Sequence, residues 1–137
     1  MPEVATTDEE EQGLAALKFD VFARGCPARS TLEHVTGRWS ILVLGGLDAG
    51  PMRFNALLRR VEGVSEKMLA QALQALRRDG FVHREVRTAF PPNVEYSLTP
   101  LGRETSAKVR GLIEHLEAHM PQVLAANEHY DQEQISG

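Results

Sequence analysis

The side chains with the clearest chemical potential lie on one face of a predicted helix near the middle of the chain. With about 100° of rotation per residue, Leu69, Leu73 and Leu76 point to one side of this helix. Lys and Arg side chains reach phosphates or guanine, and Gln makes paired hydrogen bonds to adenine, so a face built from them suits the major groove of DNA. An ordinary solvated helix surface is the alternative. The opposite side carries four long donors and no acid: Lys67, Gln71, Gln74 and Arg78.

Cys26 is the single cysteine and the one candidate for covalent chemistry. Pro27 suits the first position of a helix, so the thiol would lie at a helix N-terminus, where partial positive charge and nearby Arg29 stabilise the thiolate. This arrangement favours oxidation to an intersubunit disulfide or to a mixed disulfide with a small thiol, and it also leaves the thiolate open to alkylation. An inert cysteine is the alternative. If the cysteine is inert, the protein would instead respond to a small molecule bound between the helices of a dimer, or it would respond to no effector.

Metal binding and enzymatic activity find little support in the sequence. His115 and His119 are four residues apart with Glu114 and Glu117 nearby, a spacing that can bind zinc. No cysteine or third histidine lies close to them, so we expect neither a metal nor another cofactor. The sequence has no Gly-rich phosphate loop, nucleophile elbow or paired acid motif, and we expect no enzyme.

Two predicted helices position the donor-bearing face. Apolar residues from Phe54 to Val61 form one stripe, and Glu62–Val64 then supplies a break with a central glycine. Ser65 opens the second helix, so Ser65 and Glu66 lie at its leading end, where base contacts usually occur. This order predicts a helix-turn-helix.

The next segment predicts a wing. Residues 81–87 and 94–98 alternate like two strands that each have one half-buried side, with Val94, Tyr96 and Leu98 as the inner set. The loop between them contains a rigid proline pair and should protrude. A plain β-hairpin packed on helices would give the same strands, but it would not explain the basic helix before them.

The remaining helices are predicted to complete one core and a dimer interface. Leu14, Leu17, Val21 and Phe22 predict a short amphipathic helix, and most apolar residues between Leu32 and Val43 are expected to lie in the core. Thr99-Pro100 starts a long helix, and Pro121 should make it kink or restart near Met120. Packing of this helix on its own subunit is the alternative to homodimerisation. Its apolar seam comprises Leu101, Val109, Leu112, Ile113, Leu116 and Met120.

Length and charge restrict the class of protein. The 137 residues, 42% of them hydrophobic, suit a single domain, and we expect a cytoplasmic protein without a membrane span or secretion signal. The net charge of −4 is unevenly distributed, because residues 1–24 and 104–137 each hold six acids and two bases. The middle holds eleven bases and seven acids, so DNA would meet a locally positive segment.

From about Cys26 to Gly102 the chain resembles the HxlR-type regulators. The similarity rests on five strings: Cys26-Pro27, Gly37 to Leu42 (GRWSIL), Arg53 to Leu57 (RFNAL), Val64 to Leu69 (VSEKML) and Pro91 to Thr99 (PPNVEYSLT). The family consists of homodimeric transcription factors, so the resemblance implies operator binding. In several members of the family a cysteine followed by proline at this point senses oxidants or electrophiles. The resemblance therefore implies a sensing role for Cys26. The acidic extension before Leu14 lies outside the family pattern.

The sequence therefore predicts an α+β, mainly α fold: a winged helix-turn-helix with a two-stranded wing and a dimerisation helix over about 100–127. Residues 1–13 are predicted as an acidic flexible tail, 14–127 as one domain and 128–137 as a polar tail. We expect a homodimer on a two-fold operator in double-stranded DNA, with a small oxidant, electrophile or ligand as effector. A protein-interaction module is the alternative. The candidate DNA contacts are Arg53, Asn55, Ser65, Glu66, Lys67, Gln71, Gln74, Arg78, Arg84, Arg87 and Asn93.

Overall fold

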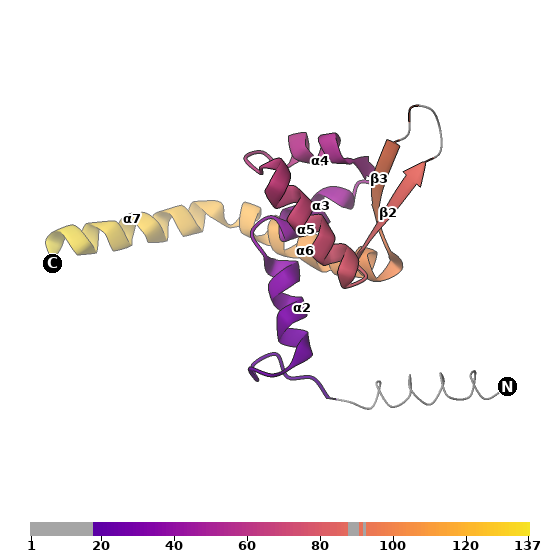
Figure 1. The fold of residues 1–137 in the computed structure, drawn as a ribbon. Coiled ribbons are helices and arrows are strands. Elements are labelled where there is room, and N and C mark those ends of the chain that lie inside the picture. Colours follow the sequence, from indigo (N-terminus) through magenta and orange to yellow (C-terminus); the bar gives the residue numbers. More distant parts are fainter. Residues whose placement is uncertain (1–17, 88–90, 92) are drawn as a thin grey trace.

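The computed structural model describes residues 18–87, 91 and 93–137, and it has the predicted winged helix-turn-helix architecture with one additional strand (Figure 1). Helices dominate, and a small antiparallel sheet stands at one side of them. The elements, in chain order, are α2 (Pro27–Thr36), α3 (Ser40–Leu47), β1 (Met52–Arg53), α4 (Phe54–Arg60), α5 (Glu66–Arg78), β2 (Val82–Arg87), β3 (Asn93–Leu98), α6 (Pro100–Ala118) and α7 (Met120–Ser136).

The sheet has three strands in the order β1-β3-β2. β3 pairs with β2 from Val82 opposite Leu98 to Arg87 opposite Asn93, and with β1 through Met52 opposite Tyr96. The sequence predicted a two-stranded sheet and therefore missed β1. The predicted alternation of burial is also absent, because β3 is half-buried along its whole length and β2 is exposed after Val82. β3 is the central strand and is covered on both edges, whereas the outer part of β2 extends away from the helices.

One hydrophobic core joins the helices to the base of the sheet. α3 lies at its centre, with Val43 and Leu44 fully buried, and it packs against α6. The buried Ser106 hydroxyl of α6 donates a hydrogen bond to the Leu44 carbonyl over 2.8 Å. The cluster of core residues that contact one another comprises Val43, Leu44, Leu47, Leu57, Val61, Val64, Leu69, Leu73, Leu76, Phe81, Val82 and Val109.

Two apolar residues expected in the core lie at the surface instead. Leu32 is 47% exposed and Leu42 is 42% exposed, because α2 is covered on one side only and Leu42 faces away from the core side of α3. The predicted helix around residues 14–22 is wrong where it can be assessed, since Val21 and Phe22 lie in turns. Leu14 and Leu17 lie outside the described residues, as does most of the predicted wing loop.

The C-terminal helix divides where the proline predicts it. α6 ends at Ala118, and α7 begins at Met120 with Pro121 in its first turn, so the restart near Met120 is confirmed. α7 projects away from the body and none of its residues is buried (Figure 1). The segment predicted as a polar tail belongs to α7 and is helical through Ser136. No helix in the described part of the chain is long and apolar enough to cross a membrane.

Candidate nucleic-acid interface

α5 has the two faces that its sequence predicts. Ser65 is its N-cap, with the hydroxyl oxygen accepting the Met68 N–H over 3.1 Å, and Glu66 places a negative charge in the first turn. Leu69, Leu73 and Leu76 are buried. None of the donors opposite forms an ion pair with any described residue, so their hydrogen-bonding groups are available. The exposed donors on this opposite face are Lys67, Gln71, Gln74 and Arg78.

The three wing candidates differ in what they can offer. Arg84 is exposed and has no acidic partner among the described residues, whereas Arg87 forms an ion pair with Glu95 over 3.3 Å. The amide oxygen of Asn93 is buried without a hydrogen-bond partner in the described structure. Nothing in the sequence distinguished these residues, but within the described part of the hairpin Arg84 is the arginine that forms no ion pair.

A third group of polar side chains surrounds the start of α4. Arg53 is the N-cap of α4, and Arg53 and Asn55 line a hollow of about 590 Å³ beside the sheet. Arg59 lines the same hollow and was missed by sequence reasoning. Arg59 follows Asn55 by four residues, which places both side chains on one face of the helix, and this spacing could have identified Arg59 from the sequence. Glu95 contributes an acid at the edge of this group.

Cys26 occupies the predicted position at the N-cap of α2, with Pro27 as the first helical residue. The cysteine is partly exposed and lines a shallow hollow together with Arg24, Arg29 and Glu33. Arg29 also lies 3.8 Å from Glu33, so part of its charge is balanced within α2. The thiol is therefore accessible to small reagents and has arginine nearby.

An exposed apolar strip runs along α6 and into α7. Leu112 and Leu116 are each 48% exposed, although Val109 on the same helix is buried in the core. Thus α6 packs on its own domain through one edge and leaves a neighbouring edge uncovered. We call this uncovered edge the α6 apolar strip, and it comprises Leu112, Leu116, Met120, Val123 and Leu124.

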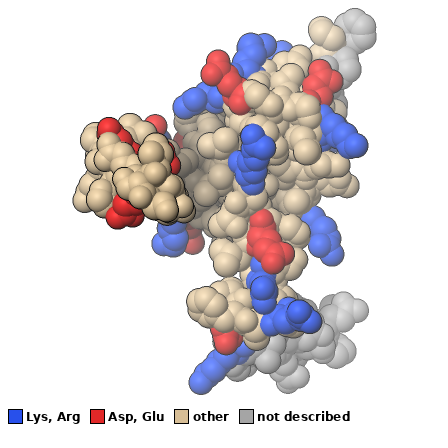
Figure 2. All heavy atoms as spheres, turned by 90° about the vertical axis from the view of Figure 1, so that its left-hand side faces the viewer, with Lys and Arg blue, Asp and Glu red and all other residues tan. Residues whose placement is uncertain are grey.

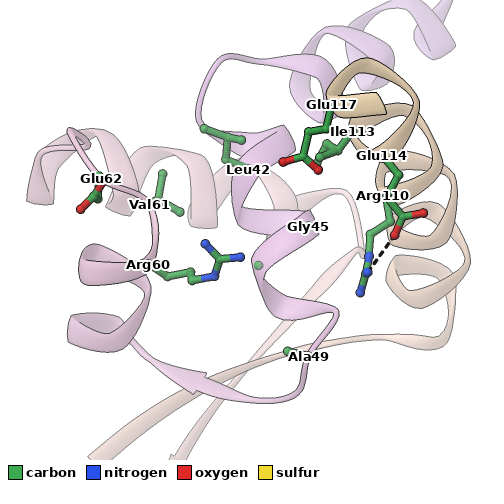
Figure 3. A pocket seen from close by; sticks show the side chains of 11 residues that line it. Leu42, Gly45, Ala49, Arg60, Val61, Glu62, Arg110, Ile113, Glu114 and Glu117 are labelled. Atoms are coloured by element: carbon green, nitrogen blue, oxygen red, sulfur yellow. Dashed lines mark hydrogen bonds and ion pairs between the residues drawn. The ribbon is translucent and has the colours of Figure 1, made fainter. Parts of the chain in front are cut away.

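A hollow of about 450 Å³ lies between α3, α4 and α6 (Figure 3). Arg60 points across it toward Gly45 from one side, while Arg110 lies on the other side. Arg110 donates hydrogen bonds to the carboxylates of Asp48 and Glu114, which raise the pKa of its guanidinium above the ordinary value. Besides the two arginines, the charged side chains that line this hollow are Glu62, Glu114 and Glu117.

Away from α5, acidic and basic side chains are mixed on the surface. α7 contains three acids and no Lys or Arg, and Figure 2 shows acidic and basic side chains interspersed over the face toward which α7 points.

His115 and His119 stack with ring centroids 4.3 Å apart, and no cluster of three metal-ligating side chains occurs within residues 18–87, 91 and 93–137.

Known proteins resemble this chain in both sequence and fold. A family model described as HxlR-like helix-turn-helix matches residues 34–124. The Escherichia coli uncharacterized HTH-type transcriptional regulator YtfH is 46% identical over 93% of this chain and 97% of its own. The solved structure of YtfH from Salmonella typhimurium has a TM-score of 0.76 and 52% identity, covering 81% of this chain and 99% of that one. The redox regulator HypR in its oxidised form has a TM-score of 0.63 and 38% identity, covering 68% and 96%.

Proposed function

Because this chain belongs to the HxlR-like helix-turn-helix family of transcriptional regulators, we propose that it binds operator DNA as a homodimer. The observation that carries the proposal is the division of α5 into a buried leucine face and an exposed face of unpaired donors. A helix anchored in this way can enter the major groove without losing its packing. The α6 apolar strip supports pairing of two copies, since a small domain rarely leaves such a strip in water.

Each group of polar residues has a distinct role in the proposed complex. Lys67, Gln71 and Gln74 contact base edges or adjacent phosphates, and Ser65, Glu66 and Arg78 extend this contact along α5. Two copies related by a dyad would read half-sites about one helical turn apart. The residues proposed to contact the DNA backbone are Arg53, Asn55 and Arg59 at α4 and Arg84, Arg87 and Asn93 at the wing.

Gln71→Ala is expected to weaken binding to specific DNA by about tenfold or more, because each copy loses one paired contact to a base. Binding to random DNA should change little, since Gln71 carries no charge. The measurement is fluorescence anisotropy with DNA from upstream of the protein's own gene and with random DNA. Gln132→Ala, on the exposed α7, is the matched control. A wild-type protein that shows no preference for the upstream DNA would favour the protein-interaction alternative.

Arg84→Ala is expected to weaken binding to all sequences equally and to lower the salt dependence, because a phosphate contact carries no sequence information. The slope of log K against log salt should decrease by about one for each copy. Titrations at four salt concentrations measure this slope, with the exposed α6 residue Arg103→Ala as the control. An unchanged slope would remove Arg84 from the contact surface.

We also propose that Cys26 senses oxidants or electrophiles. Its place at the N-cap of α2, its accessibility and the similarity of this chain to the redox regulator HypR support this role. Diamide treatment is expected to change specific DNA affinity by about tenfold, a typical coupling between two sites, and Cys26→Ser should abolish the change. If the Cys26→Ser protein responds equally to diamide, Cys26 is not the sensor and has a structural role at most.

A further inference from the structure

One side-chain contact connects α2 to the end of the recognition helix α5. His34 Nδ1 lies 2.6 Å from Asp79 Oδ2, and the two residues are 45 positions apart in the chain. Their side chains are only 32% and 14% exposed, so the contact is more shielded than a typical surface pair. A carboxylate oxygen can only accept, and His34 Nδ1 must therefore donate the hydrogen.

The contact matters for α2 because little else fixes this helix. None of its ten residues is buried, and only the partly buried Val35 packs against the core cluster. Arg29 pairs with Glu33 inside α2, and the Thr31 and Thr36 hydroxyls donate to carbonyls of the same helix. Within the described structure, His34 to Asp79 is the one side-chain hydrogen bond from α2 to another element.

The contact matters equally for α5, because Asp79 is the C-cap of that helix. A negative charge at a helix C-terminus opposes the helix dipole and contributes unfavourably unless a donor balances it. Gly80, with φ of +84°, then ends the helix, and the Phe81 N–H donates to the Leu76 carbonyl over 2.9 Å. On the other side, the Thr99 hydroxyl donates to the Gly80 carbonyl over 2.6 Å. The last turn of α5 is thus held by α2 and by the start of α6.

We infer that His34 and Asp79 are a positioning pair for DNA recognition: they fix the end of α5 against α2, and so set the orientation in which its exposed donors meet DNA. This inference rests on the proposed DNA-binding function. Neither residue needs to touch DNA. His34 lies in the last turn of α2, the helix whose N-cap is Cys26, so the pair connects the end of α2 to the recognition helix.

The first test measures α5 in the absence of DNA. Hydrogen–deuterium exchange of the full chain should show faster exchange in the last turn of α5 in His34→Ala than in the wild type, because that turn loses the hydrogen bond that joins it to α2. His34→Asn keeps a donor close to the position of Nδ1 and should restore most of the protection. Unchanged exchange in His34→Ala would overturn the inference, whatever the protein does with DNA.

The second test is a double-mutant cycle on DNA affinity. His34→Ala and Asp79→Ala are each expected to weaken specific binding by about fivefold, while the double variant should be no weaker than either one, since the two residues act as a unit. Binding of His34→Ala to random DNA should change by less than about twofold, because this variant keeps every Lys and Arg, and non-specific binding depends on their charges. His129→Ala is the matched control, since it removes an exposed His–Glu pair on α7.

The outcomes of the cycle separate this inference from the proposed function. Additive losses, or equal losses on specific and random DNA, would overturn a positioning role. A wild-type protein without any preference for specific DNA would overturn the proposed function, and the exchange measurement would still decide whether the pair positions α5. Thermal unfolding of each variant shows whether a lost affinity simply reflects unfolded protein.

Discussion

Replacing Gly102 by alanine is expected to lower the free energy of unfolding by about 3 kcal/mol or more. A Cβ atom built on Gly102 would lie 1.9 Å from the Phe81 carbonyl oxygen and 2.8 Å from its carbon. Both are backbone atoms of the turn that follows α5, so no side chain can rotate to make room. The start of α6 would have to move away from that turn.

The site cannot relax easily, because hydrogen bonds hold both segments together. The Thr99 N–H donates to the Phe81 carbonyl over 3.1 Å, and the Thr99 hydroxyl donates to the Gly80 carbonyl over 2.6 Å. Moving α6 outward would break these contacts and expose Phe81, which is buried in the core. This contact explains why the helix carries a glycine in its first turn, where an alanine would ordinarily favour helix formation.

Gly111 in the same helix is the matched control. No atom lies within 4 Å of a Cβ built there, so Gly111→Ala should stabilise the protein by about 1 kcal/mol through helix propensity alone. Urea unfolding of the three proteins at one concentration, followed by circular dichroism, measures both effects. Equal stability of Gly102→Ala and the wild type would show that the junction between α5 and α6 can open to accommodate a methyl group.

Leu116→Glu is expected to convert the proposed homodimer into monomers and to abolish tight operator binding. Leu116 lies in the middle of the α6 apolar strip, so a charge there would be buried without a partner in the dimer. An interface residue of this kind contributes at least about 2 kcal/mol, and the dimer dissociation constant should rise about thirtyfold or more. Sedimentation velocity over a range of protein concentrations measures this constant.

The control for this substitution is Ala107→Glu, which adds the same side chain to the exposed opposite side of α6. This variant should remain dimeric and bind DNA like the wild type. A Leu116→Glu protein that stays dimeric would place the subunit contact elsewhere. A dimer lost together with the folded structure would be recognised by circular dichroism, and Leu116→Ser would then test the interface with a milder change.

Sequence predicts best those features that depend on neighbouring residues. The two faces of α5, the caps at Ser65 and Thr99 and the helix restart at Met120 all follow from local spacing and local backbone chemistry. These features determine where the proposed DNA-reading face lies. The helix-turn-helix and wing could therefore be predicted in their correct order.

The features that sequence missed depend on contacts between distant segments. β1 has only two residues, and its pairing with β3 spans more than forty positions of the chain, so no periodic pattern signals it. His34 and Asp79 each resemble ordinary surface residues until the fold brings them together. Leu42 has the spacing of a core residue, and its exposure follows from how α3 packs against α6.

None of the side chains of α2 is buried, so a chemical change at its N-cap should have little effect on the stability of the fold. A covalent change at Cys26 meets solvent and a shallow hollow, so it removes no atom from the close-packed interior. Residue 26 can therefore be exchanged during evolution for a different reactive group, or for an inert one, at little cost in folding. The leucines of α5 have no such freedom. A lineage can thus acquire or lose a signal while keeping the same helix-turn-helix scaffold.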